Sequence, residues 1–136
     1  MEKQIIALYG RGGSGKTSTL KLVIEAFEHT PQANVQRLKD GVDIRALIIY
    51  GGLRIGIETQ GDPNSRLAES LEIFVKEGCH IIICATRTRG NTVDLVKGYA
   101  PKYEIRWIEQ SYRKTVAEQT LINAKTASEI FVLAKN

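Results

Sequence analysis

Residues Gly10 to Thr17 read GRGGSGKT, and this octapeptide decides how the rest of the chain is interpreted. It matches the pattern G-x-x-x-x-G-K-[ST] at every fixed position. A short apolar run, Ile5 to Tyr9, precedes it. An amphipathic stretch follows, with apolar residues at helical spacing: Leu20, Val23, Ile24 and Phe27. The octapeptide therefore lies between a predicted strand and a predicted helix, which is where a phosphate-binding loop belongs.

The residue types of the octapeptide suit contact with a polyphosphate. Glycines allow the φ values that curl the loop, and they remove side chains that would block close approach. The helix that begins near Gly15 adds unpaired N–H groups and the positive end of its dipole. Lys16 is predicted to reach the β- and γ-phosphates, and the Thr17 hydroxyl to ligate Mg²⁺. The predicted nucleotide-binding residues are Gly10, Arg11, Gly12, Gly13, Ser14, Gly15, Lys16, Thr17 and Ser18.

On this octapeptide and its flanks, the chain resembles the P-loop NTPase superfamily. The resemblance implies ATP and Mg²⁺ as cofactors, with an acidic residue after an apolar strand to hold Mg²⁺ directly or through water. The Asn-Lys-x-Asp pattern that GTPases use for guanine is absent, so adenine is the predicted base. A Leu-Ser-Gly-Gly-Gln-like signature is also absent, which disfavours an ABC-type ATPase. The motifs outside the loop point to no single family within the superfamily.

Length and composition predict one globular domain over residues 1–136. The chain is 43% hydrophobic and 25% charged, as in an ordinary globular protein. Its net charge of +4 suits a nucleotide triphosphate and permits contact with nucleic acid, but the basic residues are spread out and form no patch. The sequence shows no signal peptide and no stretch of membrane-spanning length, so a cytoplasmic protein without a membrane partner is predicted.

Apolar runs and turn residues predict the element order β-α-(β)-β-β-α-β-α-β-α, in which Val35–Lys39 is the short strand in brackets. Gly51-Gly52 joins Ile44–Tyr50 to Leu53–Glu58, which indicates a tight antiparallel hairpin. The near-continuous apolar run Cys79–Thr86 is typical of a central strand covered on both faces. We therefore predict an α/β fold: a three-layer α/β/α sandwich around a largely parallel sheet with an inserted antiparallel β-hairpin, as in P-loop NTPases.

Polar residues after the second hairpin strand are predicted to join the octapeptide, because ligands bind beyond the carboxyl ends of parallel strands. Glu58 ends an apolar strand and is predicted to bind Mg²⁺ or to orient an attacking water. Asp62 is the alternative acidic residue. Asp62 also precedes Pro63, a pair typical of a helix N-cap followed by proline at the first helical position.

Two further strand ends are predicted at the same edge. After the central strand, Arg87 and Arg89 are predicted to neutralise charge that develops in phosphoryl transfer, and the segment 86–92 resembles a very short kinase lid. After the last strand, Glu109–Lys114 is predicted to contact the base or to supply another arginine, although solvated charged loops are common.

These residues leave three functions open. The first is a Mg²⁺-dependent ATPase that couples hydrolysis to a protein partner or to self-assembly, because little chain remains for a substrate domain. The second is a small-molecule or nucleotide kinase that uses Arg87 and Arg89 as its lid. The third is a non-catalytic nucleotide-binding module that regulates a partner or nucleic acid. The predicted catalytic residues are Lys16, Glu58, Asp62, Arg87 and Arg89, and the predicted metal ligands are Thr17 and Glu58.

Overall fold

The computed structural model describes residues 2–136, in which three strands follow one another after the first helix and strands and helices alternate elsewhere. The elements are β1 (Gln4–Tyr9), α1 (Lys16–Glu28), β2 (Ala33–Lys39), β3 (Arg45–Tyr50), β4 (Leu53–Glu58), α2 (Leu67–Lys76), β5 (Ile81–Thr86), α3 (Asn91–Lys97), β6 (Glu104–Glu109) and α4 (Val116–Lys135). This order is the predicted one, and it includes the short strand that follows the first helix.

Within residues 2–136, six strands form one mixed sheet in the order β2-β3-β4-β5-β1-β6. Strands β4, β5, β1 and β6 run parallel, whereas β2, β3 and β4 are antiparallel neighbours. Tyr50 pairs with Leu53 across the tight turn, where Gly51 and Gly52 have φ of +56° and +82°. Glycine adopts two successive positive φ values without strain, as a type I′ turn requires, so the predicted hairpin is confirmed.

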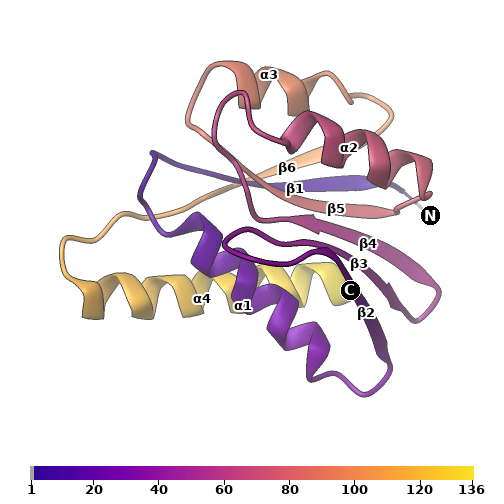
Figure 1. Ribbon diagram of the computed structural model, residues 1–136, viewed down its shortest axis with the longest axis horizontal. Helices are drawn as coiled ribbons and strands as arrows, with labels where there is room; N and C mark the ends of the chain where they lie inside the picture. The colour runs from indigo at the N-terminus through magenta and orange to yellow at the C-terminus, as the bar shows by residue number, and fades with distance from the viewer. Residues whose placement is uncertain (1) are drawn as a thin grey trace.

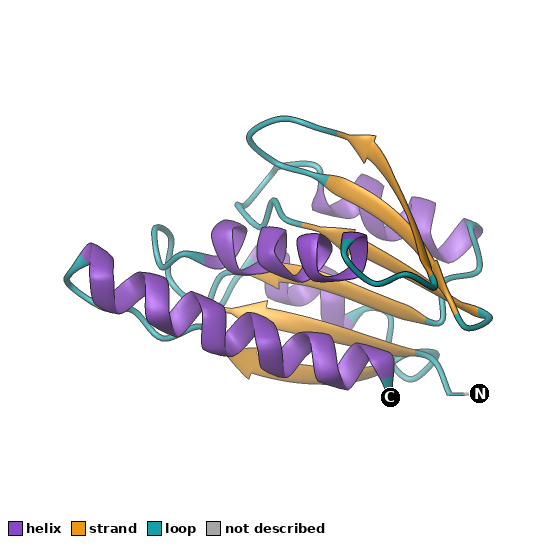
Figure 2. Cartoon of the chain, turned by 90° about the horizontal axis from the view of Figure 1, so that it is seen from below, coloured by secondary structure: helices purple, strands orange, loops and turns teal. Residues whose placement is uncertain are grey.

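Helices cover both faces of the sheet, α1 and α4 on one and α2 and α3 on the other (Figures 1 and 2). Alternate residues of β1 face opposite sides. Ile6 and Leu8 pack in the cluster that contains the buried residues of α1 and α4, and Ile5 and Ala7 pack in the cluster that contains those of α2. The molecule is therefore an α/β protein with a mixed sheet of six strands and, within residues 2–136, four helices.

The carboxyl ends of β4, β5, β1 and β6 meet at one edge of the sheet, and β5 separates β1 from β4. The chain that leaves β4 reaches the loop after β1 by passing across the end of β5. At Gly61 this crossing is tight: a Cβ there would lie 2.5 Å from the carbonyl oxygen of Ala85. Glycine at this position therefore lets the segment after β4 close onto the loop after β1.

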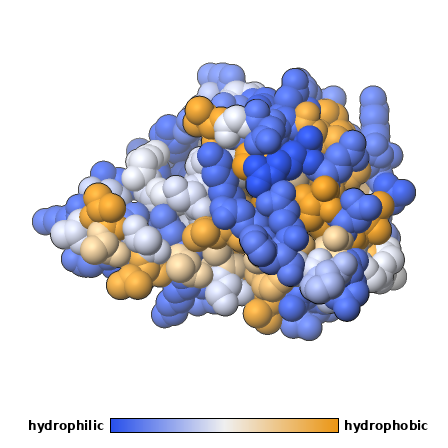
Figure 3. All heavy atoms as spheres, turned by 60° about the horizontal axis from the view of Figure 1, so that its bottom comes forward, coloured by the Kyte–Doolittle hydropathy of each residue, from blue (hydrophilic) through white to orange (hydrophobic). Residues whose placement is uncertain are grey.

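Helix α4 carries several exposed apolar side chains. Val116, Leu121 and Val132 are 84%, 72% and 50% exposed. Figure 3 views the side of the molecule on which α1 and α4 lie, and there orange hydrophobic areas are separated by blue hydrophilic ones. Scattered apolar residues of this kind are normal on a protein surface. No helix in residues 2–136 combines the length and the apolar character needed to cross a bilayer.

Candidate functional site

The loop between β1 and α1 curls tightly, and two glycines make the curl possible. Gly13 and Gly15 have φ of +74° and +89°, and Gly15 occupies the N-cap position of α1. A Cβ on Gly15 would lie 2.7 Å from Oδ1 of Asn123 on α4. A side chain at position 15 would therefore strain the backbone and also displace the Asn123 side chain.

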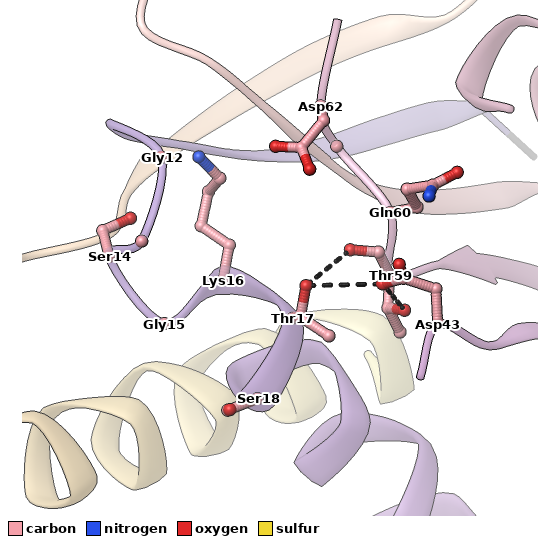
Figure 4. A pocket seen from close by; sticks show the side chains of 12 residues that line it. Gly12, Ser14, Gly15, Lys16, Thr17, Ser18, Asp43, Thr59, Gln60 and Asp62 are labelled. Carbon is pink, nitrogen blue, oxygen red and sulfur yellow. Dashed lines mark hydrogen bonds between the residues drawn. The ribbon is translucent and has the colours of Figure 1, made fainter. Parts of the chain in front are cut away.

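A pocket of about 240 Å³ opens at this loop (Figure 4). Three segments of the chain line it: the loop with the first residues of α1, Asp43 in the loop before β3, and the segment after β4. The lining residues are Gly12, Gly13, Ser14, Gly15, Lys16, Thr17, Ser18, Asp43, Thr59, Gln60, Gly61 and Asp62. Of the predicted nucleotide-binding residues, Gly10 and Arg11 line a different hollow, on the side of β6.

Lys16 points from the start of α1 back under the loop toward Gly12 (Figure 4). Its side chain is 8% exposed, and its ammonium group donates hydrogen bonds to the backbone oxygens of Gly10 and, at 3.1 Å, Arg11. The pKa of Lys16 is lowered from 10.5 to about 8, chiefly by burial and next by the charge of Arg87, while the charge of Asp62 opposes this shift. The pocket thus contains a desolvated cation that an anion would stabilise.

This pKa predicts how nucleotide affinity depends on pH. In the free protein the Lys16 ammonium loses its proton as the pH rises through about 8, and a bound polyphosphate would raise that pKa. Affinity for an ATP analogue is therefore expected to be level below about pH 8 and to fall above it, by up to about tenfold per pH unit, with proton uptake on binding. Calorimetric titrations from pH 7 to 9.5 in buffers of different ionisation enthalpy measure both effects. Constant affinity without proton uptake across this range would contradict the prediction.

Asp43 contacts Thr17, although the sequence analysis did not predict it as a site residue. The Thr17 hydroxyl lies 3.4 Å from Oδ1 of Asp43 and 3.3 Å from the backbone oxygen of Thr59. The Thr59 hydroxyl donates to the same Asp43 oxygen at 2.9 Å and accepts from the N–H of Ile44 at 2.9 Å. These bonds, drawn in part in Figure 4, join three separate segments at one point.

The oxygen atoms of Thr17 and Asp43 are the kind of ligand that Mg²⁺ prefers, directly or through water. Residues 2–136 contain no cluster of three or more His, Cys, Asp or Glu side chains suited to a metal. Mg²⁺ is commonly held by one or two protein groups together with substrate phosphates and waters.

Arg87 and Asp62 meet over the loop from the ends of β5 and β4. Nη2 of Arg87 lies 3.0 Å from Oδ1 of Asp62, and these side chains are 38% and 68% exposed. The Arg87 guanidinium also lies against Gly12, where its central carbon would be 2.8 Å from an added Cβ. An exposed ion pair of this kind contributes about 1 kcal/mol or less, so a ligand can separate it at little cost.

Two buried polar atoms at the site have no hydrogen-bond partner within the described chain. They are the Ser14 hydroxyl, on a side chain that is 1% exposed, and Nε of Arg87. Native proteins leave few such groups unpaired, and a phosphate oxygen is a suitable acceptor for both. The residues present therefore fit a polyphosphate.

The segment after β4 differs from its predicted form. Helix α2 begins at Leu67 with Arg66 in the cap position, so the prediction that Asp62 caps a helix starting at Pro63 is wrong. The backbone oxygen of Asp62 instead accepts a hydrogen bond from the Ser65 hydroxyl in the loop before the helix. The Asp62 carboxylate faces Lys16 across the pocket (Figure 4).

Glu58 lies outside the residues that line the pocket. Its side chain is completely buried, and Oε1 accepts hydrogen bonds from Ser70 and, at 2.9 Å, from Nε of Arg66. Nε of Arg45 is 3.7 Å from the same oxygen, and Oε2 accepts from the N–H of Gln60 at 2.9 Å. Glu58 thus ties β4 to α2 and to the segment that lines the pocket, and its role as a metal ligand stays a prediction that these contacts do not favour.

Arg89 and the segment after β6 also lie outside this pocket. Arg89 is exposed in the loop before α3. Gln110, which sequence analysis did not single out, is buried behind the loop: its Nε2 donates to the Ser14 backbone oxygen at 3.0 Å and to Oδ1 of Asn123 at 2.7 Å. Its Oε1 accepts from the Thr19 hydroxyl at 3.0 Å. Its position directly after the last strand was the available clue.

Comparison of the chain with protein-family models, curated proteins and solved structures finds no match.

Proposed function

We propose that the protein is a P-loop NTPase, with the three-layer α/β/α fold of that superfamily, which binds Mg²⁺–ATP in the pocket at Gly12–Ser18 and hydrolyses it. The observation that supports this most is the convergence of Lys16, Thr17 and Asp43, a buried cation beside two oxygen ligands for Mg²⁺. Hydrolysis would be coupled to a protein partner or to self-assembly.

Each group has a role that follows from its position. The N–H groups of the loop and of the start of α1 would bind the phosphates, with the Lys16 ammonium moving from the loop carbonyls to the β- and γ-phosphates. Thr17 and Asp43 would hold Mg²⁺ and its waters. Arg87, released from Asp62, would neutralise charge on the γ-phosphoryl group.

In hydrolysis, the oxygen of a water molecule bonds to the γ-phosphorus while the bond from that phosphorus to the β–γ bridging oxygen breaks. ADP and inorganic phosphate leave, and the proton lost by water passes to solvent. Asp62 would orient this water, a role supported by its carboxylate, which faces Lys16 across the pocket (Figure 4).

Phosphoryl transfer to an acceptor is the second candidate function, and the position of Arg87 favours it. This arginine comes from the segment after β5 that resembles a short kinase lid, and its guanidinium lies against Gly12 of the loop. Arg89, the other predicted lid arginine, is exposed and does not line the pocket.

Phosphate release from Mg²⁺–ATP without any acceptor tests hydrolysis, and Asp43→Asn tests the site. We expect measurable release by the unmodified protein and about 10- to 100-fold lower turnover or Mg²⁺ affinity in the variant, the range usual for groups that orient a metal and its ligands. Asp40→Asn is the matched control, since Asp40 is in the same loop but pairs with Arg37 on the surface. ATP binding without release would favour transfer or the non-catalytic module, and no ATP binding at all would refute the proposal.

A further inference from the structure

A second hollow lies on the β6 side of the phosphate-binding loop, away from the pocket that holds Lys16. Two cavities of about 270 and 360 Å³ share Tyr9 and Thr88 as lining residues, so they adjoin at these two side chains. The groove runs from α3, past the edge strand β6, to Gly10 and Arg11 at the start of the loop. We call it the β6 groove.

Exposed aromatic rings line the β6 groove. Trp107 pairs in register with Ala7 on the side of the sheet that α2 and α3 cover, yet it is 36% exposed because β6 is an edge strand. Tyr9 meets it edge to face, with ring centroids 6.3 Å apart. Tyr112, beyond the end of β6, is 42% exposed and carries the Arg11 guanidinium 4.0 Å from its ring centroid. Rings held by neighbours in this way offer rigid stacking surfaces.

The β6 groove is also positively charged. Arg11 comes from the phosphate-binding loop, Lys97 from the last turn of α3 and Arg113 from the segment after β6. Within residues 2–136, one acidic residue lines the groove, Glu109. Three cations against one carboxylate favour an anion, and the rings favour a planar apolar group.

We propose that the β6 groove binds a nucleobase with an attached phosphate, as a second ligand beside the nucleotide of the loop. The base stacks on Trp107 or Tyr112, as bases stack on aromatic side chains in other proteins. The phosphate contacts Arg11, Lys97 or Arg113. Either a mononucleotide or a base within a single strand presents this chemistry. Because Gly10 and Arg11 belong to both the groove and the loop, the two ligands would bind on opposite sides of the same backbone.

The chain contains a single tryptophan, Trp107, so tryptophan fluorescence reports directly on the groove. AMP and an octamer of deoxythymidylate are titrated into the full chain, with ribose 5-phosphate and inorganic phosphate as probes that lack a base. We expect at least one of the first two to quench Trp107 and to give a calorimetric binding signal, whereas the two other probes give neither. Quenching by AMP identifies a mononucleotide site. Binding of the octamer but not of AMP identifies a site for single-stranded nucleic acid.

Two substitutions test the contacts. Tyr112→Ala is expected to weaken binding about tenfold through the loss of one stacking surface. Lys97→Ala is expected to weaken it several-fold, whereas Lys125→Ala, which removes an exposed lysine of α4, leaves it unchanged. Absence of binding by both nucleotide probes, equal binding of ribose 5-phosphate, or calorimetric affinity that is unchanged in both Tyr112→Ala and Trp107→Ala would overturn the proposal. The same titrations are repeated with the Lys16→Ala variant. Because the groove does not include Lys16, binding of the probes to the groove should be unchanged in this variant, whether or not the proposed function is correct.

Discussion

Replacement of Lys16 by alanine is expected to weaken binding of Mg²⁺–ATP by about 10- to 100-fold. A hydrogen bond to a charged group contributes about 1.5–3 kcal/mol when its partner would otherwise be left unpaired, and 1.4 kcal/mol corresponds to a factor of ten. Lys16 is almost fully buried within the loop, so solvent or a neighbouring side chain cannot easily replace its charge. Calorimetric titration with a non-hydrolysable ATP analogue in the presence of Mg²⁺ measures the loss.

Two comparisons make the Lys16 result specific. Lys125→Ala removes an exposed lysine from α4 and should leave ATP affinity unchanged, which controls for net charge. Thermal unfolding of Lys16→Ala should remain cooperative, because the charged side chain it removes is bound only to backbone oxygens of the loop and is disfavoured by burial. Undiminished ATP affinity in a folded Lys16→Ala protein would end the interpretation of GRGGSGKT as a phosphate-binding loop.

The Glu58→Ala substitution is expected to lower the free energy of unfolding by about 3–5 kcal/mol, the usual result of removing one partner from a buried ion pair. Glu58 is completely buried and Arg45 is 4% exposed, so the guanidinium of Arg45 would be left in the interior without its buried carboxylate. The Ser70 hydroxyl and the N–H of Gln60 would lose their acceptor as well. Equilibrium unfolding in urea, with unchanged m-value, measures the difference.

Glu69→Ala is the matched control for Glu58→Ala. Glu69 is 61% exposed and contacts Arg45 at 2.7 Å. The Glu69→Ala substitution therefore removes a carboxylate from the same arginine, but at the surface. Its effect should be much smaller, because solvent replaces an exposed partner. The double change of Glu58 and Arg45 to methionine should recover part of the lost stability, since it removes both charges of the buried pair and leaves only the part-exposed Arg66 without its carboxylate. Equal destabilisation by Glu58→Ala and Glu69→Ala would show that burial of the carboxylate is not what matters.

The structure also separates the two acidic residues that the sequence left as alternatives. Glu58 is the last residue of β4, whereas Asp62 comes four residues later, in the loop before α2. Glu58 faces Ser70 on α2, whereas Asp62 lies beyond the strand end and lines the pocket. The Asp62-Pro63 pair predicted a helix cap, but the helix begins only at Leu67. The tight passage of Gly61 over Ala85 constrains the path of the chain before it.

Asp43 shows why part of the site could not be predicted from the sequence. It lies 26 residues from Thr17 in the loop before β3, and no fixed spacing or residue pattern connects the two. They meet because β3 is antiparallel to β4, so the start of β3 lies beside the end of β4 at the ligand edge, where the Thr59 hydroxyl accepts from Ile44. The same edge brings Arg87 onto Gly12 from the end of β5.

The sequence by itself determined the element order, the hairpin at Gly51-Gly52 and the loop at Gly10–Thr17, because each depends on local backbone preferences and on the spacing of apolar residues. Only the tertiary structure decided which side chains surround that loop. Strand order and the crossing of the chain over β5 place Asp43 and Asp62 in the pocket and hold Glu58 against α2. The physical reason is that contacts between segments far apart in the chain depend on how the sheet is assembled, which no short stretch of sequence encodes.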